Sequence, residues 1–156
     1  MLELTEKLKQ LISQELALYA RLIVLLEQEN LSLVNNDIVL LESTTASKTL
    51  VVDEVSECVK QWVECFKNNP QLNGQNLEAF LIEHGLPEDL ENWRELKQIA
   101  QIAQENNRVN GSLINQLSIR TQNALNILNG ADQQNASLYD TKGQKTPSRR
   151  QRTIIS

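Results

Sequence analysis

The apolar residues of this chain recur at intervals of three and four positions, which is the period of an α-helix with one apolar face. Between residues 2 and 34 no glycine or proline interrupts the pattern, so we predict one long helix there. The eight charges of residues 1–34 are scattered, which indicates a solvated outer face. The apolar stripe consists of Leu4, Leu8, Leu11, Ile12, Leu18, Tyr19, Leu22, Ile23, Leu25 and Leu26.

A second long helix is predicted over residues 38–67. Asp37 is a suitable N-cap because its carboxylate can accept hydrogen bonds from free amides of the first turn. Pro70 ends the pattern shortly after residue 67. The Ser43–Ser47 patch and the valines that follow have low helix propensity, so we expect tertiary packing to stabilise this helix.

The remaining apolar positions predict a short helix over residues 76–84 and a third long helix over residues 87–129. Pro87, Glu88 and Asp89 favour a helix start. Proline has no backbone N–H, but the N–H groups of the first turn have no partner within the helix, so nothing is lost there. The two acidic side chains are attracted to the positive end of the helix dipole. Gly130 is the expected stop.

The fold class expected is therefore all-α, with three long helices and one short one in an antiparallel, coiled-coil-like bundle. Five glycines and three prolines in 156 residues leave little turn chemistry for many short strands. We expect one helical domain over residues 1–130. Residues 131–156 lack apolar periodicity and are expected to form a disordered, basic tail.

Residues 106–130 form the most distinctive stretch, because their helical pattern is not accompanied by charge. Seven side chains fall in one arc at about 100° per residue, and Ile119 lies on the far side. Candidate partner-binding residues are therefore Leu113, Ile114, Leu117, Ile119, Thr121, Ala124, Leu125 and Leu128.

The surface around this arc is polar but almost uncharged. Residues 98–130 contain only three charged side chains, whereas twelve of these 33 residues are Asn or Gln. Depletion of charge is typical of the centre of a protein interface, so we predict that a partner covers this face. The alternative is that the segment is rich in amides only because the whole chain is, with 31 Asn and Gln residues.

Asn106, Asn107 and Asn110 fall on the same arc, directly before Gly111. One interpretation is that a buried Asn fixes the register between packed helices at a cost in stability. The other is that the amides divide a packed half of the last helix from a half that is available to a partner. Whether the helix continues through this cluster is left open.

The net charge of −5 is unevenly distributed. Residues 131–156 carry five basic and two acidic residues, a net charge of +3 that leaves −8 for residues 1–130. An acidic body argues against nucleic acid as the main partner. The longest aliphatic run, Leu22 to Leu26, is far too short to span a membrane, and the acidic N-terminus does not resemble a secretory signal. We therefore expect a soluble, cytoplasmic protein.

No group of residues predicts catalysis, a metal site or a cofactor. Cys58 and Cys65 lie seven residues apart on one predicted helix, about 10 Å of rise, which excludes a mutual disulfide. We expect reduced thiols in or beside the core. His84 is expected to favour the carbonyls at the end of the short helix. No phosphate loop or catalytic triad spacing is present, and Glu88, Glu91 and Glu95 are interpreted as a solvated face.

Residues 107–156 contain a distinctive combination of motifs: Asn107, Asn110-Gly111, Leu113-Ile114, Arg120, Gln122 to Leu128, Leu138-Tyr139, Gly143-Gln144 and a basic C-terminus. Through these motifs the segment resembles the FlgN family of flagellar export chaperones, whereas residues 1–105 agree with the family in helical pattern and length. The family usually has Tyr-Gly where this chain has Tyr139-Asp140, so the turn after the tyrosine can differ.

The resemblance implies a cytoplasmic chaperone that binds hook-associated proteins 1 and 3, which form the hook–filament junction, prevents their premature assembly and presents them to the export gate. It also implies that the Gly111–Leu128 helix binds the cargo and that Leu138 and Tyr139 dock on the export-gate protein. From the residues alone, the competing interpretation is a structural coiled-coil protein whose last helix closes a permanent homodimer. A weak homo-oligomer is also compatible with the pattern.

Overall fold

The computed structural model describes residues 2–139, which form four helices and no strand. They are α1 (Leu2–Asn35), α2 (Ile38–Asn68), α3 (Leu77–His84) and α4 (Pro87–Tyr139). The chain divides into two compact units, Met1–Asn110 and Gly111–Ser156. The all-α fold class and the four helices are confirmed, and the division into a domain over residues 1–130 and a tail stays a prediction.

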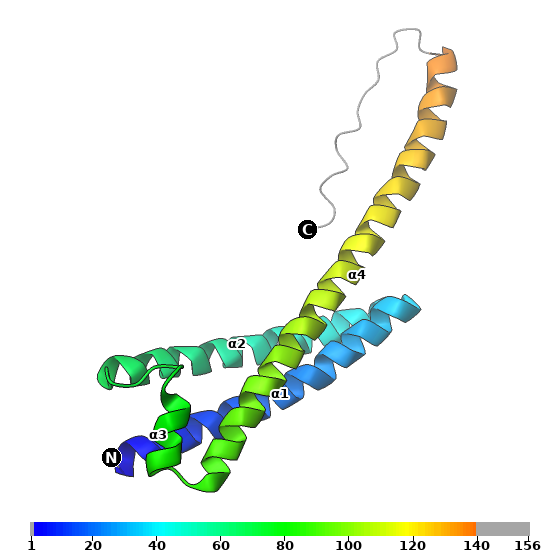
Figure 1. The fold of residues 1–156 in the computed structure, drawn as a ribbon. Helices are drawn as coiled ribbons and strands as arrows, with labels where there is room; N and C mark the ends of the chain where they lie inside the picture. Colours follow the sequence, from blue (N-terminus) through cyan, green and yellow to red (C-terminus); the bar gives the residue numbers. More distant parts are fainter. Residues whose placement is uncertain (1, 140–156) are drawn as a thin grey trace. The chain divides into compact units, whose positions relative to one another are not determined.

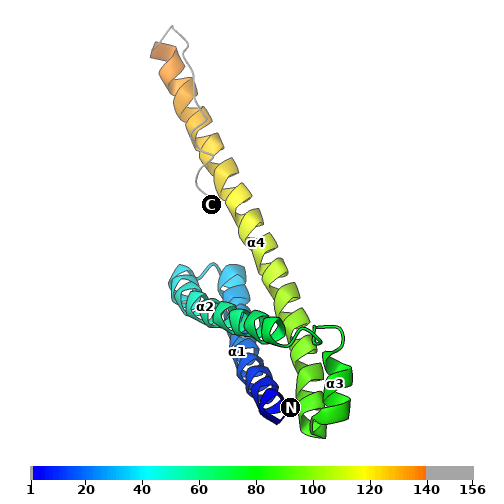
Figure 2. The ribbon, with the colours of Figure 1, turned by 90° about the vertical axis from the view of Figure 1, so that its left-hand side faces the viewer.

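Helices α1 and α2 form an antiparallel hairpin and lie side by side in both views (Figures 1 and 2). α1 ends in a Schellman motif, in which Asp37 N–H bonds Ser32 C=O at 2.8 Å and Asn36 N–H bonds Leu33 C=O at 3.4 Å. Asn36 supplies the left-handed conformation that this motif needs, with φ 56°. Asp37 then caps α2, as predicted, because its carboxylate accepts from Leu40 N–H at 3.0 Å.

Asparagine side chains hold the loop between α2 and α3. Asn73 Oδ1 accepts from the backbone amides of Gln75 and Asn76 at 2.8 and 2.9 Å. Asn76 Nδ2 donates to Gln71 C=O at 2.7 Å. These bonds satisfy backbone groups that no helix serves, and they place Leu72 in the core.

α3 ends at Gly85, where no other residue fits. A Cβ on Gly85 would lie 2.9 Å from Leu81 C=O, and the Gly85 amide donates to that same oxygen at 2.8 Å. His84 stacks on Phe80 with ring centroids 4.7 Å apart.

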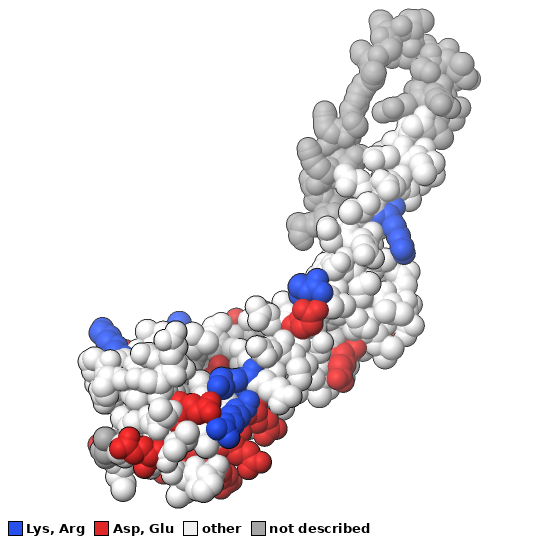
Figure 3. Space-filling view, viewed as in Figure 1, with Lys and Arg blue, Asp and Glu red and all other residues white. Residues whose placement is uncertain are grey.

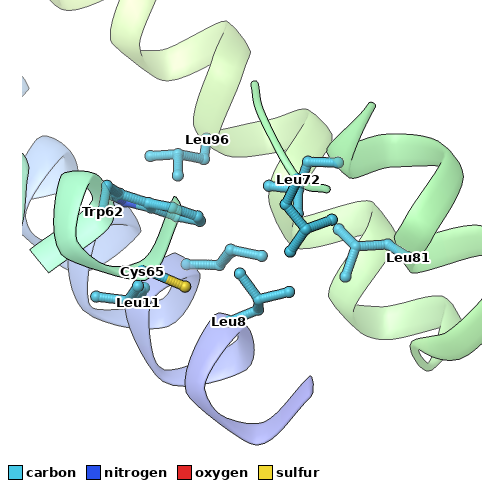
Figure 4. Close-up of a cluster of buried hydrophobic side chains, with 9 residues drawn as sticks. Leu8, Leu11, Trp62, Cys65, Leu72, Leu81 and Leu96 are labelled. Carbon is cyan, nitrogen blue, oxygen red and sulfur yellow. The ribbon is translucent and has the colours of Figure 1, made fainter. Parts of the chain in front are cut away.

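The main core of the first unit brings together side chains from all four helices and the α2–α3 loop (Figure 4). Trp62 packs against two other aromatic side chains, with ring centroids 5.5 Å from Phe66 and 5.7 Å from Trp93. A smaller cluster of Leu22, Leu26, Val51 and Ala103 continues the packing along the hairpin. The buried members of the main core are Leu8, Leu11, Ile12, Trp62, Cys65, Leu72, Leu77, Leu81 and Leu96.

One carboxylate is buried in this unit beside the aromatic residues. Glu15 Oε2 accepts a hydrogen bond from Trp62 Nε1 at 2.5 Å. Burial raises the pKa of Glu15 above its ordinary value, and the bond from Trp62 opposes that effect. Burial and the nearby Glu15 also raise the pKa of Cys58. Cys58 and Cys65 are both free and buried, as expected.

α4 begins where the sequence predicts but ends later. Asp89 is buried, and its Oδ2 accepts from Leu86 N–H at 3.3 Å. The helix passes without interruption through Asn106 to Gly111 and ends at Tyr139, so Gly130 is not the stop. Glycine lowers helix propensity by only about 1 kcal/mol, and no proline follows to break the helix. Residues 131–139, predicted to belong to the tail, are therefore helical.

Candidate functional site

The candidate partner-binding face lies on α4 between Gly111 and Gly130. Every side chain from residue 111 to residue 130 is exposed or half-buried. Leu113 and Leu117 are half-buried, whereas the other candidates are exposed: Ile114, Ile119, Thr121, Ala124, Leu125 and Leu128. The apolar stripe that the periodicity predicts is thus present and uncovered within the described chain.

Five of these residues form a continuous ridge with alternating spacings of three and four, at Ile114, Leu117, Thr121, Ala124 and Leu128. Such spacing aligns side chains along one helix face. The Thr121 hydroxyl donates to Leu117 C=O at 2.9 Å, so it is engaged with the backbone of its own helix. The middle of the ridge therefore offers small, mostly apolar groups between larger aliphatic ones.

Ile119 lies off this ridge, as expected from its position. Ile127, which the sequence interpretation omitted, is the most exposed large apolar residue of the segment at 73 %. Its distance of ten residues from Leu117 places it about 80° to the side of the ridge. The apolar surface is therefore broader than the predicted arc.

The same segment is almost free of charge. Arg120 is the only charged residue between Gly111 and Gly130. The space-filling view shows the corresponding part of α4 as mostly white, whereas the first unit carries many red and blue groups (Figure 3). A helix exposed to water normally carries charged side chains that support it at i,i+4 spacing, so its surface composition is that of a covered face.

Asn110, the last residue of the first unit, is 1 % exposed, and its amide group is fully engaged. Its Nδ2 donates to Leu26 C=O at 2.8 Å and to Glu29 Oε1 at 2.9 Å. Its Oδ1 accepts from Asn30 Nδ2 at 3.0 Å. Asn110 thus fixes α4 against α1 at one position, as the register interpretation requires.

An ion pair between the buried Glu29 and the half-buried Lys48 extends this network to α2. Lys48 Nζ donates to Glu29 Oε1 and Oε2 at 3.0 and 3.2 Å, and to Asn107 Oδ1 at 2.7 Å. Glu29 is 3 % exposed. The Lys48–Glu29 bonds join α2 to α1, whereas the bonds to Asn107 and Asn110 depend on the position of α4. Sliding α4 by one turn would therefore leave the buried Asn110 amide unpaired and remove one partner each from Lys48 and Glu29.

Both interpretations of the asparagine cluster are thus compatible with the structure. Asn107 and Asn110 fix the register of the packed part of α4. No described side chain after Asn110, as far as residue 130, is buried. The polar network therefore marks the place along α4 where burial ends.

Glycines stand at both ends of the stretch from residue 111 to residue 130. A Cβ added to Gly111 or Gly130 would meet nothing within 4 Å, so neither glycine is required for space. Each remains in helical conformation at a cost of about 1 kcal/mol relative to alanine.

The predicted docking pair, Leu138 and Tyr139, forms the last two residues of α4. Nothing is described of their side chains, and the basic residues 142–152 lie outside the described part of the chain. The docking of Leu138 and Tyr139 on the export gate stays a prediction.

The glutamates of α3 and of the first turns of α4 belong to an ordinary charged surface. Glu88, Glu91 and Glu95 are exposed, and Glu78 pairs with Arg94 at 2.7 Å and Lys97 at 3.1 Å. These two partners lower the pKa of Glu78 through hydrogen bonds. Among residues 2–139, no three His, Cys, Asp or Glu side chains are grouped to hold a metal ion. No described helix is long and apolar enough to cross a membrane.

Comparison with known families identifies the chain. The profile of the family described as FlgN protein matches residues 1–147. The chain belongs to the FlgN family. FlgN is a chaperone family, so membership implies the role of a flagellar export chaperone. The match extends over the N-terminal residues, for which the sequence alone showed only helical pattern and length. No curated protein and no solved structure matches the chain.

Proposed function

We propose that this FlgN protein holds hook-associated proteins 1 and 3 through the Gly111–Leu128 face of α4, prevents their premature assembly and delivers them to the flagellar export gate. The observation that carries the cargo site is an exposed, continuous aliphatic ridge with one charge in twenty residues. Family membership supports flagellar proteins as the partners.

The ridge favours a helical partner. A helix-in-groove contact uses anchors at i, i+3, i+4 and i+7. Ile114, Leu117 and Thr121 have the relative positions i, i+3 and i+7, and Leu117, Thr121 and Ala124 have i, i+4 and i+7. The amides around the ridge tolerate both water and a partner, because they carry no charge that must be desolvated. A partner with a similar aliphatic stripe would bury the ridge and leave the amides at the rim.

The contribution of Leu117 and Leu125 to the affinity of the complex can be estimated. Leu117 and Leu125 are partly exposed, so each contributes at the lower end of the usual range for a buried leucine, about 1.5 kcal/mol. Together they account for about 3 kcal/mol, or roughly a hundredfold in affinity.

The test replaces both leucines by glutamate. Leu117→Glu with Leu125→Glu should abolish co-purification of the two hook-associated proteins, because the new carboxylates would have to be desolvated in the complex. Circular dichroism should still show the parent helical content. If the double variant retains the parent affinity, the face is assigned wrongly.

The first half of the same helix provides a matched control. Ile102 and Val109 are also partly exposed apolar residues of α4, but they belong to the first unit. Ile102→Glu with Val109→Glu adds the same charge to the same helix and should leave cargo binding intact. Equal loss in both double variants would indicate a general effect of charge.

The delivery step is assigned to the end of the chain, in the cytoplasm. Leu138 and Tyr139 provide an aromatic and aliphatic pair, and the net charge of +3 in residues 131–156 favours encounter with an acidic surface. Truncation after Gly130 should preserve cargo binding while lowering export and motility. Tyr139→Ala should reproduce part of this defect. Loss of cargo binding on truncation would assign the tail to the cargo site.

A further inference from the structure

A second exposed stripe, which cargo binding by α4 does not use, runs along α2. Its six positions alternate at spacings of four and three, which is the heptad pattern of a helix seam. Over 19 residues it extends for about 27 Å. We define the α2 stripe as Thr45, Thr49, Val52, Ser56, Val59 and Val63.

The residue types of the α2 stripe are unfavourable for a helix face left in water. Five of the six are Thr or Val, whose branched side chains lose rotamer freedom in a helix. Val59 is 46 % exposed and Val63 is 61 % exposed, so packing within the chain compensates little of this cost. Thr49 donates its hydroxyl to Thr45 C=O at 3.0 Å, which reduces the polarity of the stripe further.

The stripe is distinct from both neighbouring faces of α2. One neighbouring face is buried in the first unit through Val51, Cys58 and Trp62. The other contains most of the exposed charges of α2, namely Glu42, Asp53, Glu57, Lys60, Glu64 and Lys67. The uncharged stripe between them is neither core nor ordinary solvated surface.

The charged residues beside the α2 stripe are placed so that two copies of the chain can pair their opposite charges. Asp53 follows Val52 and Lys60 follows Val59, so an acid and a base occupy equivalent positions seven residues apart. A two-fold axis near Ser56 would place Asp53 of each copy beside Lys60 of the other, forming two equivalent pairs. Ser56, the smallest residue of the stripe, would lie where the two helices approach most closely.

We propose that a second copy of this chain covers the α2 stripe, in an antiparallel homodimer with Asp53 paired to Lys60 across the two-fold axis. A parallel arrangement would place each charge level with its like, so the charges select the antiparallel one. Lys60 is available, because its contact with Glu57 at 3.5 Å joins two highly exposed groups and contributes little. Asp53 has no ion pair among the described residues.

The dimer is weak and reversible. One seam of six small or medium side chains per copy buries less surface than the area of about 800 Å² per partner that stable complexes bury. It involves α2 alone, so it differs from a permanent coiled coil closed by α4, and it leaves the Gly111–Leu128 face free.

Sedimentation velocity of the full chain across concentrations up to roughly 500 μM, a range in which even weak dimers form, tests association. The parent should show a monomer–dimer equilibrium, and Val52→Glu with Val59→Glu should remain monomeric. Leu117→Glu with Leu125→Glu should dimerise like the parent. A parent that is monomeric throughout, or whose dimer is lost only with the α4 substitutions, overturns the proposal.

Charge exchange tests the orientation. Asp53→Lys alone and Lys60→Asp alone should each weaken dimerisation by about tenfold, because each replaces two attractive pairs by two repulsive ones. The double variant should regain the parent dissociation constant, and an equimolar mixture of the two single variants should form a heterodimer at least as readily. Failure of both rescues excludes the antiparallel pairing.

Glu57→Gln serves as the matched control, since it removes the present neighbour of Lys60 without touching the stripe. Its dimer should be as tight as that of the parent or tighter. Loss of the dimer in this variant would contradict the assignment of Asp53 as the partner of Lys60.

Discussion

The two parts of α4 before and after Asn110 belong to one continuous helix, yet their side chains differ in burial and in charge. Before Asn110, Leu96 and Ala103 are buried in the cores of the first unit, and the exposed side carries ordinary ion pairs such as Arg94 with Glu78. From Gly111 to Gly130 no side chain is buried, the ridge is aliphatic and one charge remains. Helical periodicity is common to both parts, so an apolar stripe alone does not distinguish them. The loss of charge separates the two parts, and it is the reason for proposing that the second part binds a partner.

The largest effect is expected at the ion pair that precedes this boundary. Lys48→Met should destabilise the first unit by about 3–5 kcal/mol, because it leaves Glu29 buried without its cation. Glu29→Gln in the same chain should restore most of the loss, since a neutral amide can still accept from Asn110. Urea denaturation followed by circular dichroism measures both. A loss under about 1 kcal/mol would show that Glu29 is effectively solvated.

Two equivalent truncations on the same helix sharpen the comparison. Leu96→Ala should cost about 2–4 kcal/mol of unfolding free energy, because Leu96 is 3 % exposed and its removal leaves a cavity. Leu117→Ala, on the half-buried ridge, should cost less than about 1 kcal/mol. Thermal denaturation of the two variants in parallel checks the difference. Equal losses would mean that Leu117 belongs to a core.

The thiols are expected to act through packing in the first unit alone. Cys58→Ala and Cys65→Ala should each lower stability by about 1–3 kcal/mol, because both side chains are buried. Cargo binding at the α4 ridge should be unchanged in both variants and under reducing conditions. Zinc at one equivalent per chain, or loss of cargo on reduction, would contradict a packing role.

The smallest effect concerns Glu15 and depends on pH. Burial raises its pKa, so the folded state binds a proton more tightly than the unfolded state does, and the contribution of Glu15 to stability is lost as the pH rises through the raised pKa. Glu15→Gln should therefore stabilise the chain by about 1 kcal/mol at neutral pH, while still accepting from Trp62. The gain should vanish as the pH falls below about 4, where glutamate is protonated in both states. A constant gain across pH would exclude titration of Glu15 as its cause.

Local signals explain why the first three helices were predicted within one or two residues. Asp37, Pro70 and Pro87 each act on the backbone beside them, through a cap or a missing amide. The end of α4 was misplaced by ten residues because Gly130 only lowers helix propensity, and nothing after it blocks the helix. A glycine therefore predicts a helix end reliably only when a cap or a proline accompanies it.

The candidate face was predictable in position but not in exposure. Periodicity and missing charge identified Leu117 and its neighbours, whereas only tertiary packing decides whether such a stripe is covered. The buried ion pair was missed, although the sequence carried a signal: Glu29 occurs seven residues after Leu22 and Lys48 seven before Val55, both in line with apolar positions. Opposite charges at apolar positions of two adjacent helices indicate a buried pair. Their additional bonds to Asn107 and Asn110 required the third helix to be placed.

Gly111 and Gly130 have a consequence for how tightly the proposed Gly111–Leu128 face would hold its cargo. Unbound, both positions weaken the helix without relieving any steric contact, so the segment between them is less pre-organised than an alanine-bounded helix would be. A partner that binds the proposed face in helical form must hold both glycines helical whenever the free segment frays, at up to about 1 kcal/mol each. Relative to alanine at both positions, the affinity of the proposed complex is thus lowered by at most roughly thirtyfold. That loss is useful to a carrier, because a cargo held less firmly is one that the export machinery can remove.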